Sequence, residues 1–127
     1  MHYGYGKKVA LSFEEASARV KERLAEAGFG VLTEIDVKAT MKKKLDVDYD
    51  NYVILGACNP EFAHQALQAE KQIGLLLPCN MIVYEDDGKV HVSAIVPSVA
   101  MAVSSNQNLL GIANEVESKL KKVIDSI

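Results

Sequence analysis

The feature that most constrains the fold is a strict alternation of side chains in residues 90–96. Apolar residues at 90, 92, 94 and 96 alternate with His91, Ser93 and Ile95, which is the period of a strand with one buried face. A second apolar run, 80–85, precedes this strand, and Asp86-Asp87-Gly88 between them is a turn sequence. We therefore expect a β-hairpin over 80–96 and an antiparallel sheet around it.

Two long amphipathic helices are predicted to cover that sheet. Ser12 and Glu15 form a capping box at the start of the first helix, and Gly28 suits the left-handed residue that ends it. The second helix begins near Asn108 and continues to the C-terminus with a wide apolar stripe. That stripe consists of Leu109, Ile112, Ala113, Val116, Leu120, Val123, Ile124 and Ile127.

The remaining elements are shorter. We expect strands over 5–11, 29–36 and 52–57, with Phe29, Val31, Thr33 and Ile35 on one face of the second. Short helices are expected over 37–45 and from Pro60 to about Glu70, and an apolar turn or short helix over 97–103. The predicted fold is therefore α+β: a single domain with a largely antiparallel sheet of about five strands and helices packed mainly on one face.

Composition limits the function classes. The 127 residues fit one domain, 1–127, and a net charge of −3 gives no reason to expect nucleic acid as a partner. Lysines at 38 and 42–44 are interpreted as a solvated helix face, with anion binding as the minority alternative. The N-terminus lacks the apolar segment of an export signal, and no apolar run is long enough to span a bilayer. These features predict a cytoplasmic protein with reduced thiols and no membrane partner.

Three runs between Gly56 and Asn80 resemble the signature of a known family. They are Ala-Cys-Asn-Pro, Ala-His-Gln-Ala-Leu and Gly-Leu-Leu-Leu-Pro-Cys-Asn. Together they are similar to the bacterial and archaeal family labelled domain of unknown function 302. The resemblance extends from about Phe13 to the C-terminus, and it departs at Val96, where the family usually has aspartate before the proline. It implies a compact α/β sandwich and no established activity or cofactor.

The same segment contains the candidate site. Cys58, His64 and Cys79 carry ligand atoms that suit a soft transition metal such as zinc or copper. Their spacing matches none of the compact ligand pairs of structural zinc sites, and a fourth ligand would have to be water, Asp36, Glu61 or a partner chain. Asn59 and Asn80, which follow the two cysteines, are added as candidate contacts for a small ligand.

Structural roles are an equally concrete interpretation of these residues. Free cysteine usually packs as a small hydrophobe, and Asn59 is a good helix cap. Convergence of the cysteines depends on the path of residues 71–77. If the strand that begins at Asn80 starts where the preceding helix ends, it runs parallel to the strand over 52–57. The two cysteines then lie at opposite ends of the sheet. If residues 71–77 instead return in an extended conformation, Cys79 lies beside Cys58 and His64.

Three functional hypotheses follow from the sequence. The first is a small cytoplasmic binding domain with a ligand or soft metal near Cys58, His64 and Cys79. The second is a homodimeric interaction module with structural cysteines, which uses the outer sheet face of Ile82, Tyr84, His91, Ser93 and Ile95. The third is a thiol enzyme in which His64 assists a cysteine.

Overall fold

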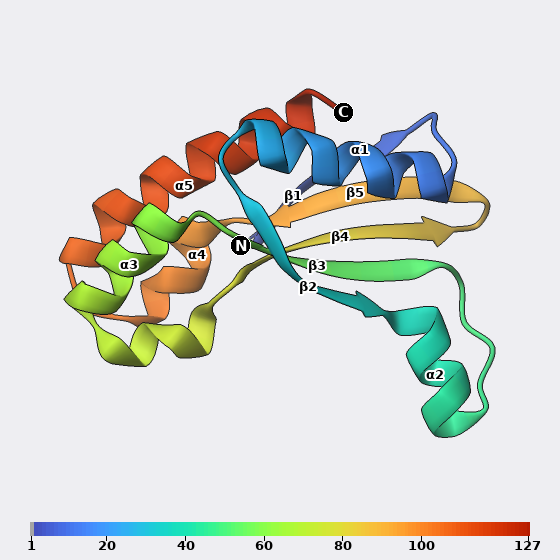
Figure 1. Cartoon of the computed structure of the whole chain (residues 1–127), viewed down its shortest axis with the longest axis horizontal. Helices are drawn as coiled ribbons and strands as arrows, with labels where there is room; N and C mark the ends of the chain where they lie inside the picture. The colour runs from blue at the N-terminus through green and yellow to red at the C-terminus, as the bar shows by residue number, and fades with distance from the viewer. Residues whose placement is uncertain (1) are drawn as a thin grey trace.

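The computed structural model of the chain describes residues 2–127 and contains one antiparallel sheet of five strands (Figure 1). The strand order is β1-β5-β4-β3-β2. The strands are β1 (Gly4–Val9), β2 (Gly30–Asp36), β3 (Tyr52–Cys58), β4 (Cys79–Asp86) and β5 (Lys89–Ile95). The predicted hairpin over 80–96 is confirmed as β4–β5, and its turn contains Asp87 and Gly88 at positive φ.

Helices lie over one face of this sheet and beyond one end of it. The long helices are α1 (Phe13–Glu26) and α5 (Asn108–Asp125), and both cross above the sheet in Figure 1. Beyond the sheet end lie α3 (Pro60–Ala69), the 3-10 turns η1 (Lys71–Leu76) and η2 (Met101–Val103), and α4 (Pro97–Ala100). At the opposite end, α2 (Val37–Leu45) projects from β2 with no buried residue. The predicted α+β domain with helices mainly on one face is therefore confirmed.

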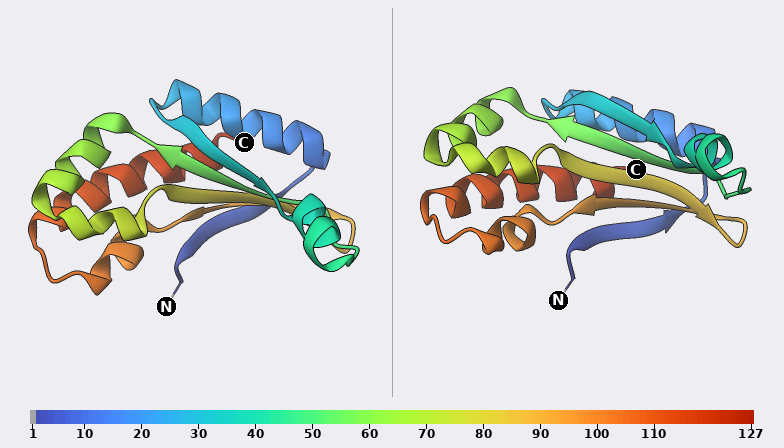
Figure 2. Two further views of the ribbon diagram at one scale, coloured as in Figure 1. Left: turned by 60° about the horizontal axis from the view of Figure 1, so that its bottom comes forward. Right: turned by 90° about the horizontal axis from the view of Figure 1, so that it is seen from below.

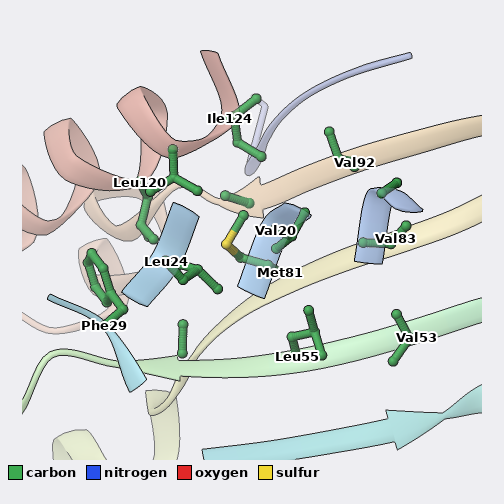
Figure 3. Packing of buried hydrophobic residues seen from close by; sticks show 14 of the residues in the cluster. Val20, Leu24, Phe29, Val53, Leu55, Met81, Val83, Val92, Leu120 and Ile124 are labelled. Carbon is green, nitrogen blue, oxygen red and sulfur yellow. The ribbon is translucent and has the colours of Figure 1, made fainter. Parts of the chain in front are cut away.

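Alternation along the central strands produces the core. Every second residue is buried along β5 and in the middle of β4, and these side chains meet the apolar stripes of α1 and α5. Figure 3 shows Leu24 of α1 between Met81 of the sheet and Leu120 of α5. All three are fully or almost fully buried. Each such side chain contributes about 1.5–3 kcal/mol relative to exposure, so the contact of these two helices with the sheet stabilises the fold.

The helix ends match the sequence signals. Ser12 accepts a hydrogen bond from the Glu15 amide while Glu15 accepts one from the Ser12 amide, which confirms the capping box. Asn59 caps α3 by accepting from the Phe62 amide, with Pro60 in the first helical position. Only the C-terminal half of α5 packs on the sheet. Its N-terminal half continues past the sheet and packs against α3 and α4.

One predicted strand face is wrong. Val31 pairs with Ala57 and Thr33 pairs with Gly56, so the register shifts by one residue between them and Leu32 is left over. Such a bulge reverses the side-chain pattern beyond it. Phe29 and Val31 therefore lie on the helix side of the sheet, whereas Thr33 and Ile35 lie on the opposite side with Ile54.

The path from α3 to β4 is also different from both predicted alternatives. Residues 71–76 form η1 rather than an extended segment. The chain nevertheless returns, because β4 runs antiparallel to β3 with Cys79 opposite Ala57. The parallel alternative is therefore wrong, and the two cysteines lie at the same end of the sheet. Gly56 is required next to this return, because a Cβ there would lie 2.7 Å from Cγ of Pro78.

Candidate functional site

An apolar cavity of about 300 Å³ lies where the sheet ends and α3, α4 and α5 converge. Its walls come from the ends of β2, β3 and β4 and from the inner faces of α3 and α5. The lining residues are Phe29, Leu32, Ala57, Cys58, Asn59, Phe62, Ala63, Ala66, Leu67, Leu77, Pro78, Cys79, Pro97, Met101, Leu109, Ile112, Ala113 and Val116. None of them carries a charge, so the cavity suits an uncharged and predominantly apolar molecule.

Short side chains create this space. Ala63 and Ala66 of α3 and Ala113 of α5 line the cavity between the two helices. An alanine does not reach across the gap that a leucine would fill, and the surrounding backbone is held in place by two neighbouring core clusters. The cavity therefore follows from the sequence of the two helices.

The cavity reaches the surface beside Leu32 and Leu67. These two side chains are 67% and 40% exposed although both line the cavity. Leu32 is the unpaired residue of the bulge in β2. Bulges often redirect a side chain next to a functional site, and here the bulge places a leucine at the cavity mouth.

Hydrogen bonds join the C-terminal end of α3 to the segment before α5. Asn106 donates from Nδ2 to the Ala69 carbonyl at 2.9 Å, and the Ser104 hydroxyl donates to Glu70 Oε1 at 3.0 Å. These bonds hold η2 and the start of α5 against α3, so the apolar walls on the two sides keep their spacing.

The structure brings together some of the sequence-predicted site residues. Cys58 and Cys79 both line the cavity, as does Asn59. The Asn59 side-chain oxygen is occupied by the α3 amide of Phe62. Asn80 lies outside this cavity, on the following and outward-facing position of β4, and lines a smaller neighbouring hollow.

His64 does not join the cysteines. It is exposed on α3 and is not part of the cavity lining. Across residues 2–127, no group of three or more histidine, cysteine, aspartate or glutamate side chains is placed to hold a metal ion. The geometry thus supports a site with two cysteines in an apolar wall and gives no support to the three-ligand metal centre.

Burial controls the chemistry of Cys79. Desolvation, with a smaller contribution from nearby Cys58, raises the pKa of the Cys79 thiol from 9.0 to about 11. The thiolate is the reactive form of cysteine, so Cys79 stays protonated and unreactive near neutral pH. This environment favours Cys79 as a neutral wall of the cavity over a nucleophile.

The raised pKa predicts a pH dependence of stability. Between pH 9 and pH 11 the unfolded chain loses the Cys79 proton while the folded chain keeps it. The free energy of unfolding should therefore fall by about 1.4 kcal/mol per pH unit in this window from this group alone. Other groups titrate there too, so the measured quantity is the difference between the unmodified protein and Cys79→Ala in urea unfolding under reducing conditions. The two stability profiles should converge from about pH 9 upwards, and profiles that stay parallel would contradict the assignment.

A glutamate replaces the missing cap at Val96. This position is the N-cap of α4, and valine offers no capping oxygen. Glu117 of α5 instead accepts a hydrogen bond from the Ser98 amide at 3.0 Å and pairs with Lys121 at 3.0 Å. Partial burial opposes ionisation, but hydrogen bonds from Ser98 and Lys121 keep the Glu117 pKa below its ordinary value. The N-terminus of α4 is thus capped from α5.

Sequence reasoning missed most of the cavity wall. It identified Cys58, Asn59 and Cys79 but not Met101, Leu109 or Ile112, which lie further along the chain. The sequence signal that could have revealed these residues was the apolar stripe of α5. This stripe extends beyond the part of α5 that covers the sheet. Its first turns therefore needed another apolar partner, and α3 supplies it.

Comparison with known proteins agrees with this fold. The model of the family described as domain of unknown function DUF302 matches residues 5–127. A solved structure, the uncharacterized conserved protein DUF302 from Bacillus stearothermophilus, is 28% identical with a TM-score of 0.92, over 98% of each chain. Among curated proteins, none matches the sequence. No helix in residues 2–127 is long and apolar enough to cross a membrane.

Proposed function

Because this chain belongs to the family described as domain of unknown function DUF302, whose description assigns no activity, we propose a function from the cavity itself. We propose that the protein is a binding domain for a small, uncharged, predominantly apolar ligand. The observation that carries the proposal is the cavity of about 300 Å³ with no charged lining residue. This volume lies at the lower end of the range for small-molecule sites, about 300–1,000 Å³.

The two cysteines contribute to this site as uncharged side chains. The protonated Cys79 thiol offers a weak hydrogen-bond donor in an otherwise apolar wall. The proposal takes both cysteines as reduced thiols of a cytoplasmic protein, which is consistent with the absence of a disulfide between them. A metal ion is not part of the proposal.

A fluorescence titration tests the proposal. N-phenyl-1-naphthylamine is a neutral probe whose emission increases in apolar surroundings. It should bind saturably at one site per chain. Ala66→Phe places a ring in the cavity from the middle of α3 and should weaken probe binding roughly tenfold or more. Gln65→Phe adds the same ring at the exposed neighbouring position and should leave binding unchanged.

Two outcomes would overturn the proposal. One is a lack of saturable probe binding by the unmodified protein. The other is equal probe affinity in Ala66→Phe and Gln65→Phe, with both variants folded by circular dichroism. If Ala66→Phe does not fold, Ala113→Leu fills the same cavity from α5 with a smaller side chain, and the same loss of affinity is expected.

We also propose that the protein forms a homodimer. Dimerisation is compatible with ligand binding in the cavity. The supporting observation is the sheet face opposite α1 and α5, which no helix covers in the right panel of Figure 2. Across this open face run an isoleucine row, with Ile35, Ile54 and Ile82 on adjacent strands, and a parallel row of aromatic rings. Such a face is suited to association with a second copy.

A further inference from the structure

A second hollow of about 220 Å³ shares one wall with the apolar cavity. Five residues line both spaces: Leu77, Pro78, Cys79, Pro97 and Met101. One layer of side chains therefore separates the apolar cavity from a second space beside the start of β4.

The second hollow opens towards the uncovered sheet face. Two of its lining residues, Asn80 of β4 and Ile95 of β5, occupy positions that alternate with buried core residues. Asn80 is exposed and provides the only carboxamide of this lining, which contains no charged side chain. The hollow thus offers a neutral hydrogen-bonding group at the end of an apolar path.

Met101 is the unbranched side chain of the shared wall, with more rotatable bonds than its neighbours. Pro78 and Pro97 are rigid rings, and Cys79 is held in the β3–β4 pairing. Met101 belongs to the short turn η2 and also lines a third hollow, of about 130 Å³, beside Ser98 and Leu109. It therefore has unfilled space on three sides, and an unbranched thioether changes rotamer more easily than a branched side chain.

We infer that the ligand is an elongated, uncharged amphiphile and that Met101 sets the length of ligand that fits. The apolar chain occupies the cavity between α3 and α5 and passes the Met101 side chain. Its neutral polar end, a hydroxyl or amide, lies in the second hollow and hydrogen-bonds Asn80. This inference rests on the proposed function, because it requires that the larger cavity binds an apolar ligand.

A homologous series of alkanols tests the inference. Straight-chain 1-alkanols from hexanol to dodecanol compete with N-phenyl-1-naphthylamine for the unmodified protein and for Met101→Ala. Affinity should rise roughly fourfold per methylene while each added group is buried, and then level off. In Met101→Ala the affinity should level off at a longer chain. Met41→Ala, on the distant helix α2, is the matched control and should reproduce the unmodified series.

A second variant tests where the polar end of the ligand binds. Asn80→Leu changes an exposed side chain and removes its hydrogen-bonding groups. It should weaken the long alkanols several-fold and leave the shortest alkanols unchanged, since these fit entirely within the first cavity. Because this side chain is exposed, the variant keeps the test decisive if Met101→Ala does not fold.

The outcomes separate the two proposals. If the unmodified protein binds neither probe nor alkanol, the proposed function fails and this inference fails with it. If probe and short alkanols bind but the chain length at which affinity levels off is the same in Met101→Ala, the Met101 side chain does not limit the ligand and only this inference is overturned. Equal effects of Asn80→Leu on short and long alkanols would likewise overturn the placement of the polar end.

Discussion

Leu24→Ala should destabilise the protein by about 3–5 kcal/mol, which is a large part of the total stability of a domain of this size. Leu24 is fully buried on α1. Figure 3 shows it between Met81 of the sheet and Leu120 of α5. Truncation to alanine removes contacts to α5 and to the sheet at once. The paired strands of the sheet cannot move to fill the space that is left.

Urea unfolding monitored by circular dichroism measures this effect. Leu75→Ala is the matched control, since the Leu75 side chain is 82% exposed in η1 and its truncation should change stability by less than about 0.5 kcal/mol. Leu24→Ala should shift the urea midpoint strongly at a similar slope. A loss for Leu24→Ala as small as that for Leu75→Ala would contradict the packing of α1 between α5 and the sheet.

The elements of the fold could be predicted because local signals agree with the final structure. The Ser12–Glu15 capping box, the Asn59-Pro60 start of α3 and the alternation in β5 all depend on interactions within a few residues. The bulge at Leu32 has no such local signature. It depends on the pairing of β2 with β3, which the sequence of either strand alone does not specify.

The candidate site could be predicted only in part for the same reason. Cys58 and Cys79 mark the ends of two adjacent strands, so their proximity followed once β4 was known to return beside β3. His64 looked equally suitable in sequence, but the cap at Asn59 and the buried position of Ala66 orient α3 so that His64 points to solvent. The cavity itself depends on how closely α3 and α5 approach each other. This distance depends on tertiary packing of short side chains, for which no sequence motif exists.

The second prediction with a large effect concerns the open sheet face, where a substitution should change the molecular mass of the protein in solution. Tyr52 stacks on Tyr84 with ring centroids 5.3 Å apart, and Tyr84 stacks on His91 at 4.8 Å. The stack spans β3, β4 and β5 beside the row that contains Ile82. Ordered aromatic rings lose little side-chain entropy on association, so this face is suited to an interface between two copies.

We expect the protein to sediment as a dimer at micromolar concentration and Ile82→Asp to sediment as a monomer. The aspartate would place a charge in the isoleucine row, where a dimer would have to bury it without a partner charge, and the desolvation cost is several kcal/mol. Ile95→Asp, further along the same face, should have the same effect, whereas Leu110→Asp on the exposed side of α5 should remain a dimer. A monomer at every concentration would reject the dimer. A dimer that survives both Ile82→Asp and Ile95→Asp would instead place the interface elsewhere, for example along the unpaired edge of β1 or β2, because neither edge strand has a partner on its outer side within residues 2–127.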